Sequence, residues 1–209
     1  MPALLPMLQT YVQTNLLDFS ALTEDRKTLL KELADYVKAK KANNKKINLV
    51  FICTHNSRRS HISQLWAQAA AAYYGIENVW SYSGGTEATA FNPRAVKAMR
   101  EAGFTIDEKQ GGENPIYAVS FSSGANAVPA FSKIYDHAEN PSQDFCAVMT
   151  CSHADEHCPF IPGVEKRIAL TFNDPKEFDN TPLESAKYAE RVKEIGTELF
   201  YAFSVLAEK

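Results

Sequence analysis

An almost uninterrupted apolar run from Ile47 to Ile52 constrains the fold of this 209-residue chain more than any other feature. A polar loop follows directly, and residues 60–74 then show the alanine-rich pattern of a helix. A strand that is buried on both faces of a parallel sheet gives such a run, because neither face meets water. The order of strand, loop and helix therefore predicts an α/β fold.

The same alternation extends toward the C-terminus of the chain. We expect further strands at 79–83, 145–150 and 167–172, and helices at 93–102 and 182–206. This order favours an open parallel sheet with helices on both faces.

Two regions lie outside this alternation. Residues 1–46 carry apolar side chains at helical spacing and end in a lysine-rich linker, so we expect a helical arm there and a catalytic domain at 47–209. Residues 108–144 are interrupted by glycine and proline, and we expect 117–121 and 131–135 to pair within a hairpin-like insertion. The sequence leaves open whether the arm forms a homodimer or covers the site.

Composition and charge exclude several classes of protein. The formal net charge of −3 gives no sign of nucleic-acid binding. No apolar stretch is long enough to cross a membrane, and the N-terminus lacks the pattern of a signal peptide. Four cysteines are too few for a disulfide scaffold in a chain of this length. We therefore expect a soluble cytoplasmic protein whose cysteines are thiols.

The loop between the first strand of the sheet and its helix is suited to chemistry. Its backbone N–H groups and the helix N-terminus converge on one point, where they can bind an oxyanion and lower the pKa of Cys53. The guanidinium of Arg59 suits two oxygens of a tetrahedral oxyanion. The residues expected to bind the oxyanion are Thr54, His55, Asn56, Ser57, Arg58 and Ser60. The alternative interpretation is a buried cysteine followed by a surface arginine.

An aspartate after the last predicted strand can complete such a site. Asp174 lies in Asn173-Asp174-Pro175, on the sheet edge where parallel α/β proteins place their sites. It is the best candidate for the acid that protonates a leaving group. Its alternative role is that of a turn or N-cap aspartate before proline.

Two further cysteines, Cys151 and Cys158, follow the predicted strand at 145–150. Together with Cys53 they suggest a nucleophile and two resolving thiols that exchange disulfides. A zinc site with His153 and His157, or inert buried thiols, are the alternatives, although the spacing matches no common zinc module.

From about Ile47 onward the chain resembles the low-molecular-weight tyrosine phosphatase fold family, and within it the thioredoxin-coupled arsenate reductases. The resemblance rests on four stretches, 53–60, Ser83-Gly84-Gly85-Thr86-Glu87 with Asn92-Pro93, 151–159 and Phe172-Asn173-Asp174-Pro175. The paired cysteines of the third stretch distinguish the reductases, because simple phosphatases of this fold do not need them.

The resemblance implies a relay of three cysteines. Cys53 would attack arsenate held by Arg59 and the loop amides, while Asp174 protonates the departing oxygen. Cys151 would then release arsenite by forming a disulfide with Cys53. Cys158 would convert that bond into a Cys151–Cys158 disulfide, which thioredoxin reduces. No bound cofactor is implied.

The sequence also departs from the family pattern. His55 stands where glycine is usual, and Arg58 stands where a cysteine is common. Gln64 replaces an acidic residue that holds a potassium ion in some relatives, whereas Asn56 and Ser83 match other positions of that cation site.

Two other functions stay open at this point. A phosphatase acting on phosphotyrosine or a small phosphoester would use the same Cys53, Arg59 and Asp174, because phosphate and arsenate share geometry and charge. A non-enzymatic oxyanion-binding protein is the third alternative. Cys146 is expected to be a buried strand thiol.

Overall fold

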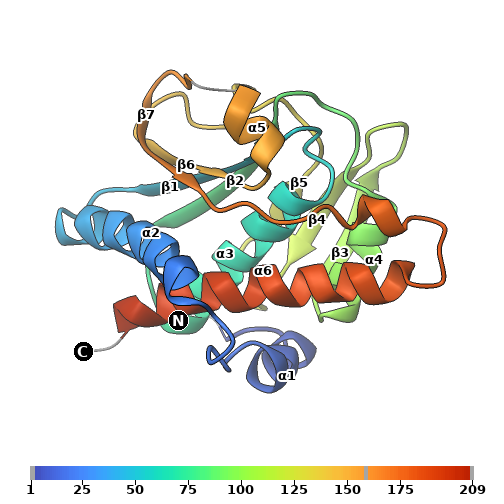
Figure 1. Cartoon of the computed structure of the whole chain (residues 1–209), viewed down its shortest axis with the longest axis horizontal. Helices are drawn as coiled ribbons and strands as arrows, with labels where there is room; N and C mark the ends of the chain where they lie inside the picture. The colour runs from blue at the N-terminus through green and yellow to red at the C-terminus, as the bar shows by residue number, and fades with distance from the viewer. Residues whose placement is uncertain (1–2, 158–159, 208–209) are drawn as a thin grey trace.

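The computed structural model describes residues 3–157 and 160–207 and has the α/β architecture expected from the sequence (Figure 1). Four parallel strands form the main sheet, in the spatial order β2 (Val79–Gly85), β1 (Ile47–Cys53), β6 (Phe145–Met149) and β7 (Val164–Ala169). Because β1 and β6 are neighbours, the loops that follow them meet at one edge of the sheet.

Helices cover both faces of this sheet, as predicted. One face carries α2 (Glu24–Ala42), α3 (Arg59–Tyr74) and the long α6 (Glu184–Ala207), and the other carries the short α5 (Ser152–His157) (Figure 1). Within the described residues, no helix combines the length and apolar character needed to cross a membrane.

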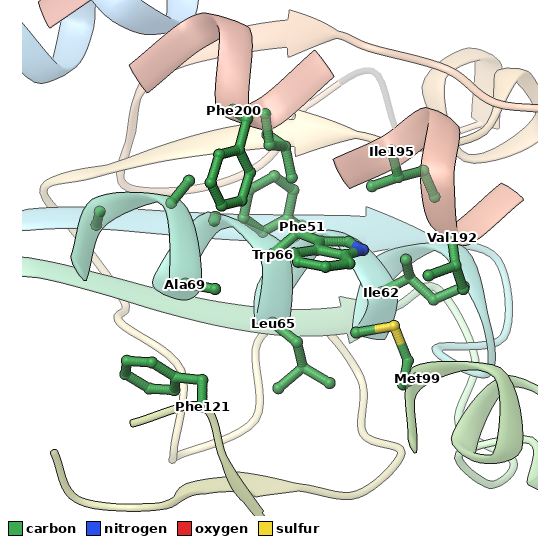
Figure 2. Packing of buried hydrophobic residues seen from close by; sticks show 14 of the residues in the cluster. Phe51, Ile62, Leu65, Trp66, Ala69, Met99, Phe121, Val192, Ile195 and Phe200 are labelled. Carbon is green, nitrogen blue, oxygen red and sulfur yellow. The ribbon is translucent and has the colours of Figure 1, made fainter. Parts of the chain in front are cut away.

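The apolar run of β1 is explained by its two buried faces. Leu49 and Phe51 point into the larger hydrophobic cluster, whereas Val50 and Ile52 point into the smaller one beneath α5. Figure 2 shows Trp66 of α3 in the larger cluster, where its ring meets Phe200 of α6 edge to face at 5.9 Å.

The N-terminal helices pack on the same core. Leu8 and Val12 of α1 (Pro6–Asn15) are fully buried in the larger cluster, and the Tyr11 ring stacks on Trp66 at 5.9 Å. Gly103 follows α4 (Pro93–Glu101) with a φ of +104°, and a Cβ at this position would collide with the backbone of Leu8. The apolar stripe predicted for this region is therefore used inside the chain.

The prediction for the insertion was wrong in its pairing. β4 (Ile116–Ser120) lies between β3 (Thr105–Gln110) and β5 (Val128–Ala130) in an antiparallel sheet, and residues 131–135 are no part of it. These residues follow the outer edge of β2 instead, because the backbone groups of Gly85 at that edge need partners. Gly85 donates its N–H to Lys133 O, and its C=O accepts from the Tyr135 N–H, both at 2.9 Å.

The last strand is also displaced from the prediction. β7 spans Val164–Ala169 rather than 167–172, and the segment after it leads to a 3₁₀ helix, η1 (Pro175–Phe178). As an edge strand, β7 is only partly buried, so its sequence lacks the continuous apolar run that marks β1 and β6.

Side-chain amides close much of the outer edge of β2. The Gln68 carboxamide accepts from the Ser81 N–H at 3.2 Å and donates to the Val79 C=O at 3.1 Å, as a neighbouring strand would. Gln64 donates its Nε2 to the Ser81 C=O at 3.2 Å. Backbone groups that would otherwise remain unpaired are satisfied in this way.

Candidate active site

The loop 53–60 joins the carboxyl end of β1 to the N-terminus of α3, as predicted, and Asn56 fixes its shape. Asn56 adopts a φ of +43°, which asparagine tolerates better than most residues. Its Nδ2 donates to Ser60 Oγ at 2.9 Å, and its Oδ1 accepts the Lys133 N–H at 2.8 Å. Gly85 backs the loop so closely that a Cβ would lie 2.7 Å from Asn56 N.

Cys53 lies at the entrance of this loop. Its side chain is buried, and its Sγ lies 3.1 Å from Ser60 Oγ, a distance at which the hydroxyl can donate to a thiolate. The same Ser60 oxygen accepts from Asn56, so the hydroxyl hydrogen is directed away from the amide. The Sγ of Cys53 thus lies beside a hydroxyl donor at the N-terminus of α3.

Arg59 is held beside the loop, and its Nε–H lacks a partner among residues 3–157 and 160–207. Its Nη1 donates to Phe172 O at 2.9 Å, and its Nη2 donates to Asp174 at 2.6 Å. Its Nε is buried, and no hydrogen-bond acceptor for it lies within the described residues. An unpaired buried donor is costly, and an oxyanion oxygen bound in the loop would satisfy it.

Asp174 has the N-cap role that was considered as its alternative, and it also contacts Arg59. One carboxylate oxygen caps η1 by accepting the Lys176 N–H at 3.1 Å, and the other accepts from Arg59. The cap fixes the carboxylate in a position where it lies against the side chain expected to hold the substrate. An oxyanion that takes hydrogen bonds from Arg59 would therefore also be close to Asp174.

Arg58 occupies a different environment from Arg59. Its side chain is expected to bind the oxyanion, but its Nε donates to Tyr188 Oη at 2.7 Å and its Nη2 donates to Asp179 at 3.1 Å. Burial is the main cause that raises the pKa of Tyr188 to about 12, so this phenol stays neutral. The guanidinium of Arg58 thus ties α3 to α6.

The other loop residues contribute mainly through their backbone contacts. Thr54 O accepts the Glu87 N–H at 2.8 Å, and Ser57 O accepts the Asn92 N–H at 2.9 Å. The His55 imidazole is partly exposed, with its Nε2 3.6 Å from the Glu87 carboxylate. These contacts hold the loop from its outer side.

Cys151 lies at the same sheet edge as Cys53, directly after β6. Its side chain is 1% exposed, and its Sγ lies 3.4 Å from Thr54 Oγ1 in the loop. The Ala154 N–H donates to the same sulfur at 3.4 Å. The fold therefore places a second thiol against the loop that carries the first. Cys158 lies outside the described residues.

Cys146 is a buried strand thiol, as expected. It lies within β6, faces the larger hydrophobic cluster and is fully buried. Burial raises the pKa of its thiol well above the ordinary value. Cys146 therefore has the properties of a packing residue.

The residues that could hold a cation already have protein partners. Asn56 Oδ1 accepts from Lys133, and Ser83 Oγ lies 3.2 Å from His61 Nδ1. Lys133 is itself a buried cation in this region, so these residues do not fit a monovalent cation, and we derive no step from one. In the described parts of the chain, no group of three or more His, Cys, Asp or Glu residues could hold a metal ion.

Sequence reasoning missed Lys133 and His61. Lys133 holds Asn56 from 77 residues away in the chain, and no local motif marks it. His61 follows the loop directly, and burial lowers the pKa of its imidazole well below the ordinary value, so it is neutral. Most residues beside it in the sequence are polar, so the sequence gave little sign that this histidine is buried.

Comparison with known proteins identifies the family. Residues 48–117 match the low molecular weight phosphotyrosine protein phosphatase family. An arsenate reductase of Bacillus licheniformis is 33% identical over 156 residues, which cover 74% of this chain and 93% of that protein. The chain belongs to the low molecular weight phosphotyrosine phosphatase family. The family predicted from the sequence is thereby confirmed.

Two further proteins illustrate the range of the family. An arsenate reductase of Halalkalibacterium halodurans is 33% identical over 158 residues, covering 75% of this chain and 94% of that protein. A crystal structure of a low molecular weight phosphotyrosine phosphatase from Vibrio cholerae has a TM-score of 0.51 at 13% identity, over 78% of this chain and 97% of that one. The latter supports the fold alone. The chain is thus an enzyme of a family that includes both reductases and phosphatases.

Proposed function

We propose that this enzyme reduces arsenate to arsenite through a relay of Cys53, Cys151 and Cys158, with thioredoxin as the external reductant. The observation that carries the proposal is the contact at 3.4 Å between Cys151 Sγ and Thr54 Oγ1. A second buried thiol beside the oxyanion loop serves a thiol relay, whereas phosphate ester hydrolysis needs only one. The relatives named arsenate reductase support the same choice.

In the first step, the Cys53 thiolate attacks the arsenic of arsenate. A sulfur–arsenic bond forms, and one oxygen leaves as water after Asp174 supplies a proton. The loop N–H groups and the free Nε–H of Arg59 hold the remaining oxygens. A bound oxyanion would compete with Asp174 for the positive charge of Arg59, so binding would weaken this ion pair and free the carboxyl group for protonation.

In the second step, the Cys151 thiolate attacks the sulfur of Cys53. The sulfur–sulfur bond forms, the sulfur–arsenic bond breaks, and its electron pair stays on arsenic, which leaves as arsenite. Cys158 then attacks Cys151, which restores the Cys53 thiolate and leaves a Cys151–Cys158 disulfide. Two electrons pass from two thiols to arsenic. A dithiol of the thioredoxin type returns them, which places the proposed reaction in a reducing cytoplasm.

The competing function is hydrolysis of phosphotyrosine or a small phosphoester. It would use the same Cys53, Arg59 and Asp174, and the family match at residues 48–117 favours it. The two functions differ in one respect that can be measured, because hydrolysis has no use for Cys151 or Cys158.

The test follows NADPH oxidation in a mixture of the enzyme, arsenate, thioredoxin and thioredoxin reductase. Wild type is compared with Cys53→Ser, Cys151→Ser and Cys158→Ser, and Cys146→Ser is the matched control for the loss of a thiol. The same variants are assayed for hydrolysis of p-nitrophenyl phosphate. We expect NADPH oxidation in wild type and Cys146→Ser only, while hydrolysis survives in all variants except Cys53→Ser.

Absence of arsenate-dependent NADPH oxidation in wild type, together with undiminished hydrolysis in Cys151→Ser and Cys158→Ser, would favour the phosphatase. Thiol counting gives a second measurement. Arsenate should remove two titratable thiols from wild type and from Cys146→Ser.

A further inference from the structure

A cavity of about 430 Å³ lies along the outer edge of β2, and no residue of the loop 53–60 lines it. Its walls come from β2, from α3, from β5 and from residues 121–127, which connect β4 to β5. The volume lies within the range of small-molecule sites in proteins. None of the proposed steps of arsenate reduction uses this cavity.

Two buried polar side chains in the cavity wall have unused hydrogen-bonding capacity. Gln64 is 2% exposed, and its Oε1 is buried without a hydrogen-bond partner in the described part of the chain. Lys133 is 4% exposed. Among the described residues, its Nζ has no hydrogen-bond or ion-pair partner. One group is an acceptor and the other is a cationic donor.

The amine of Lys133 is in an unfavourable environment. Burial lowers its pKa to about 8, and the nearby Glu139 opposes this effect only in part. Its close contact is the Phe131 ring, whose centroid lies 4.5 Å from Nζ. An anion bound in the cavity would give the ammonium the partner that it lacks.

The other residues that line the cavity indicate the shape and charge of the ligand that would fit. Val79, Phe121 and Val128 present apolar surface, and Trp80, which is 54% exposed, also lines the cavity. Such walls suit a flat apolar group. The exposed carboxylate of Glu139 also lines the cavity and disfavours a second negative charge, so a monoanion fits better than phosphate.

We propose that this cavity binds a small aromatic monocarboxylate that carries a hydroxyl group. The carboxylate accepts from Lys133 Nζ, the hydroxyl donates to Gln64 Oε1, and the ring lies against the apolar wall. The backbone N–H of Lys133 holds Asn56 of the loop, so the bound carboxylate is one residue away from the catalytic loop.

The experiment uses 4-hydroxybenzoate as probe and the two tryptophans of the full chain as reporters. Their indole N–H signals are followed by ¹H–¹⁵N NMR in saturating inorganic phosphate, which occupies the catalytic loop. We expect the signal of Trp80, at the cavity, to shift with a dissociation constant on the order of 1 mM. The signal of Trp66, buried in the core, serves as the internal control.

Variants and ligand analogues test the two polar contacts. Lys133→Met should weaken binding about tenfold or more, because a charge-assisted hydrogen bond is lost. Lys109→Met, at an exposed lysine of β3, is the matched control and should leave binding unchanged. On wild type, phenol should bind about tenfold more weakly than 4-hydroxybenzoate, and benzoate several-fold more weakly.

The proposal is overturned if the Trp80 signal does not move at about 10 mM probe, a concentration well above the expected dissociation constant. It is equally overturned if Lys133→Met binds as wild type does, or if phenol binds as tightly as 4-hydroxybenzoate. The analogue series uses wild type alone and thus decides the question even if Lys133→Met does not fold.

Discussion

Two cysteine-bearing segments meet at one edge of the sheet, and they are built differently. The loop 53–60 is fixed by Asn56, whose side chain binds both Ser60 and Lys133, and by Gly85, which leaves no space behind it. The segment with Cys151 leads into a helix of six residues, which is held by a partly exposed ion pair of 2.7 Å between Arg167 and Asp155. The first has the rigidity that an oxyanion site requires, and the second has the weaker restraint that a moving thiol requires.

The largest effect should come from a substitution in the rigid loop that keeps the positive charge but loses the planar guanidinium. Arg59→Lys should lower kcat/KM for arsenate about 10³-fold, because an ammonium cannot supply the guanidinium's donors in a plane. Steady-state kinetics measures this. Arg58→Lys is the neighbouring control, and its main expected effect is a lower melting temperature, since Arg58 binds Tyr188 and Asp179. A loss below tenfold in Arg59→Lys would contradict the assignment.

A change within the scaffold of the loop should have a smaller effect. Asn56→Ala removes the bonds to Ser60 and Lys133 and should cost about 1–3 kcal/mol of unfolding free energy. We also expect kcat to fall at least tenfold, because an unpositioned Ser60 supports the Cys53 thiolate less well. Urea unfolding and steady-state kinetics provide the two measurements. Unchanged kcat in a destabilised variant would show that the loop does not need this support.

A substitution in the segment that follows Cys151 should change local mobility more than it changes overall stability. Asp155→Ala removes a partly exposed ion pair with Arg167, so its cost in stability should be about 1 kcal/mol or less. Amide hydrogen exchange should accelerate in residues 152–157 and stay unchanged in residues 53–60. Equal acceleration in both segments would mean that they open together, which would remove the distinction drawn between them.

The smallest effect on arsenate reduction is expected at Cys146, the thiol that lies away from both segments. Cys146→Ala should leave arsenate reduction unchanged and cost about 1–2 kcal/mol of stability through the space that the sulfur leaves. In the folded wild-type protein, Cys146 should resist alkylation, because burial raises the pKa of its thiol. Peptide mapping after treatment with iodoacetamide checks this, and rapid labelling of Cys146 would contradict its structural role.

The parts of the site that sequence could predict are those within one strand–loop–helix unit. The run Ile47–Ile52 and the following loop locate Cys53 and Arg59, because local spacing alone places them at a strand end and a helix start. The different environment of Arg58 could not be predicted, since it is the same residue type as its neighbour Arg59. Tyr188 and Asp179 decide the position of Arg58, and both come from the far end of the chain.

The predicted pairing within the insertion was wrong for a related reason. The weak apolar alternation at 131–135 is equally compatible with a hairpin strand and with an extended segment along another sheet. Tertiary hydrogen bonds to Gly85 decide between them, and they depend on the open edge of β2. The support that Lys133 gives to Asn56 follows from the same placement, so it could not be foreseen either.

The carboxamides along β2 have a consequence for the behaviour of the protein in concentrated solution. An open strand edge invites pairing with a second molecule, and many proteins prevent this with lysine or proline. Here Gln68 satisfies the backbone donor and acceptor that an invading strand would use. The β2 edge is thus protected against edge-to-edge pairing partly by uncharged side chains, and this part of its protection should be insensitive to both salt and pH.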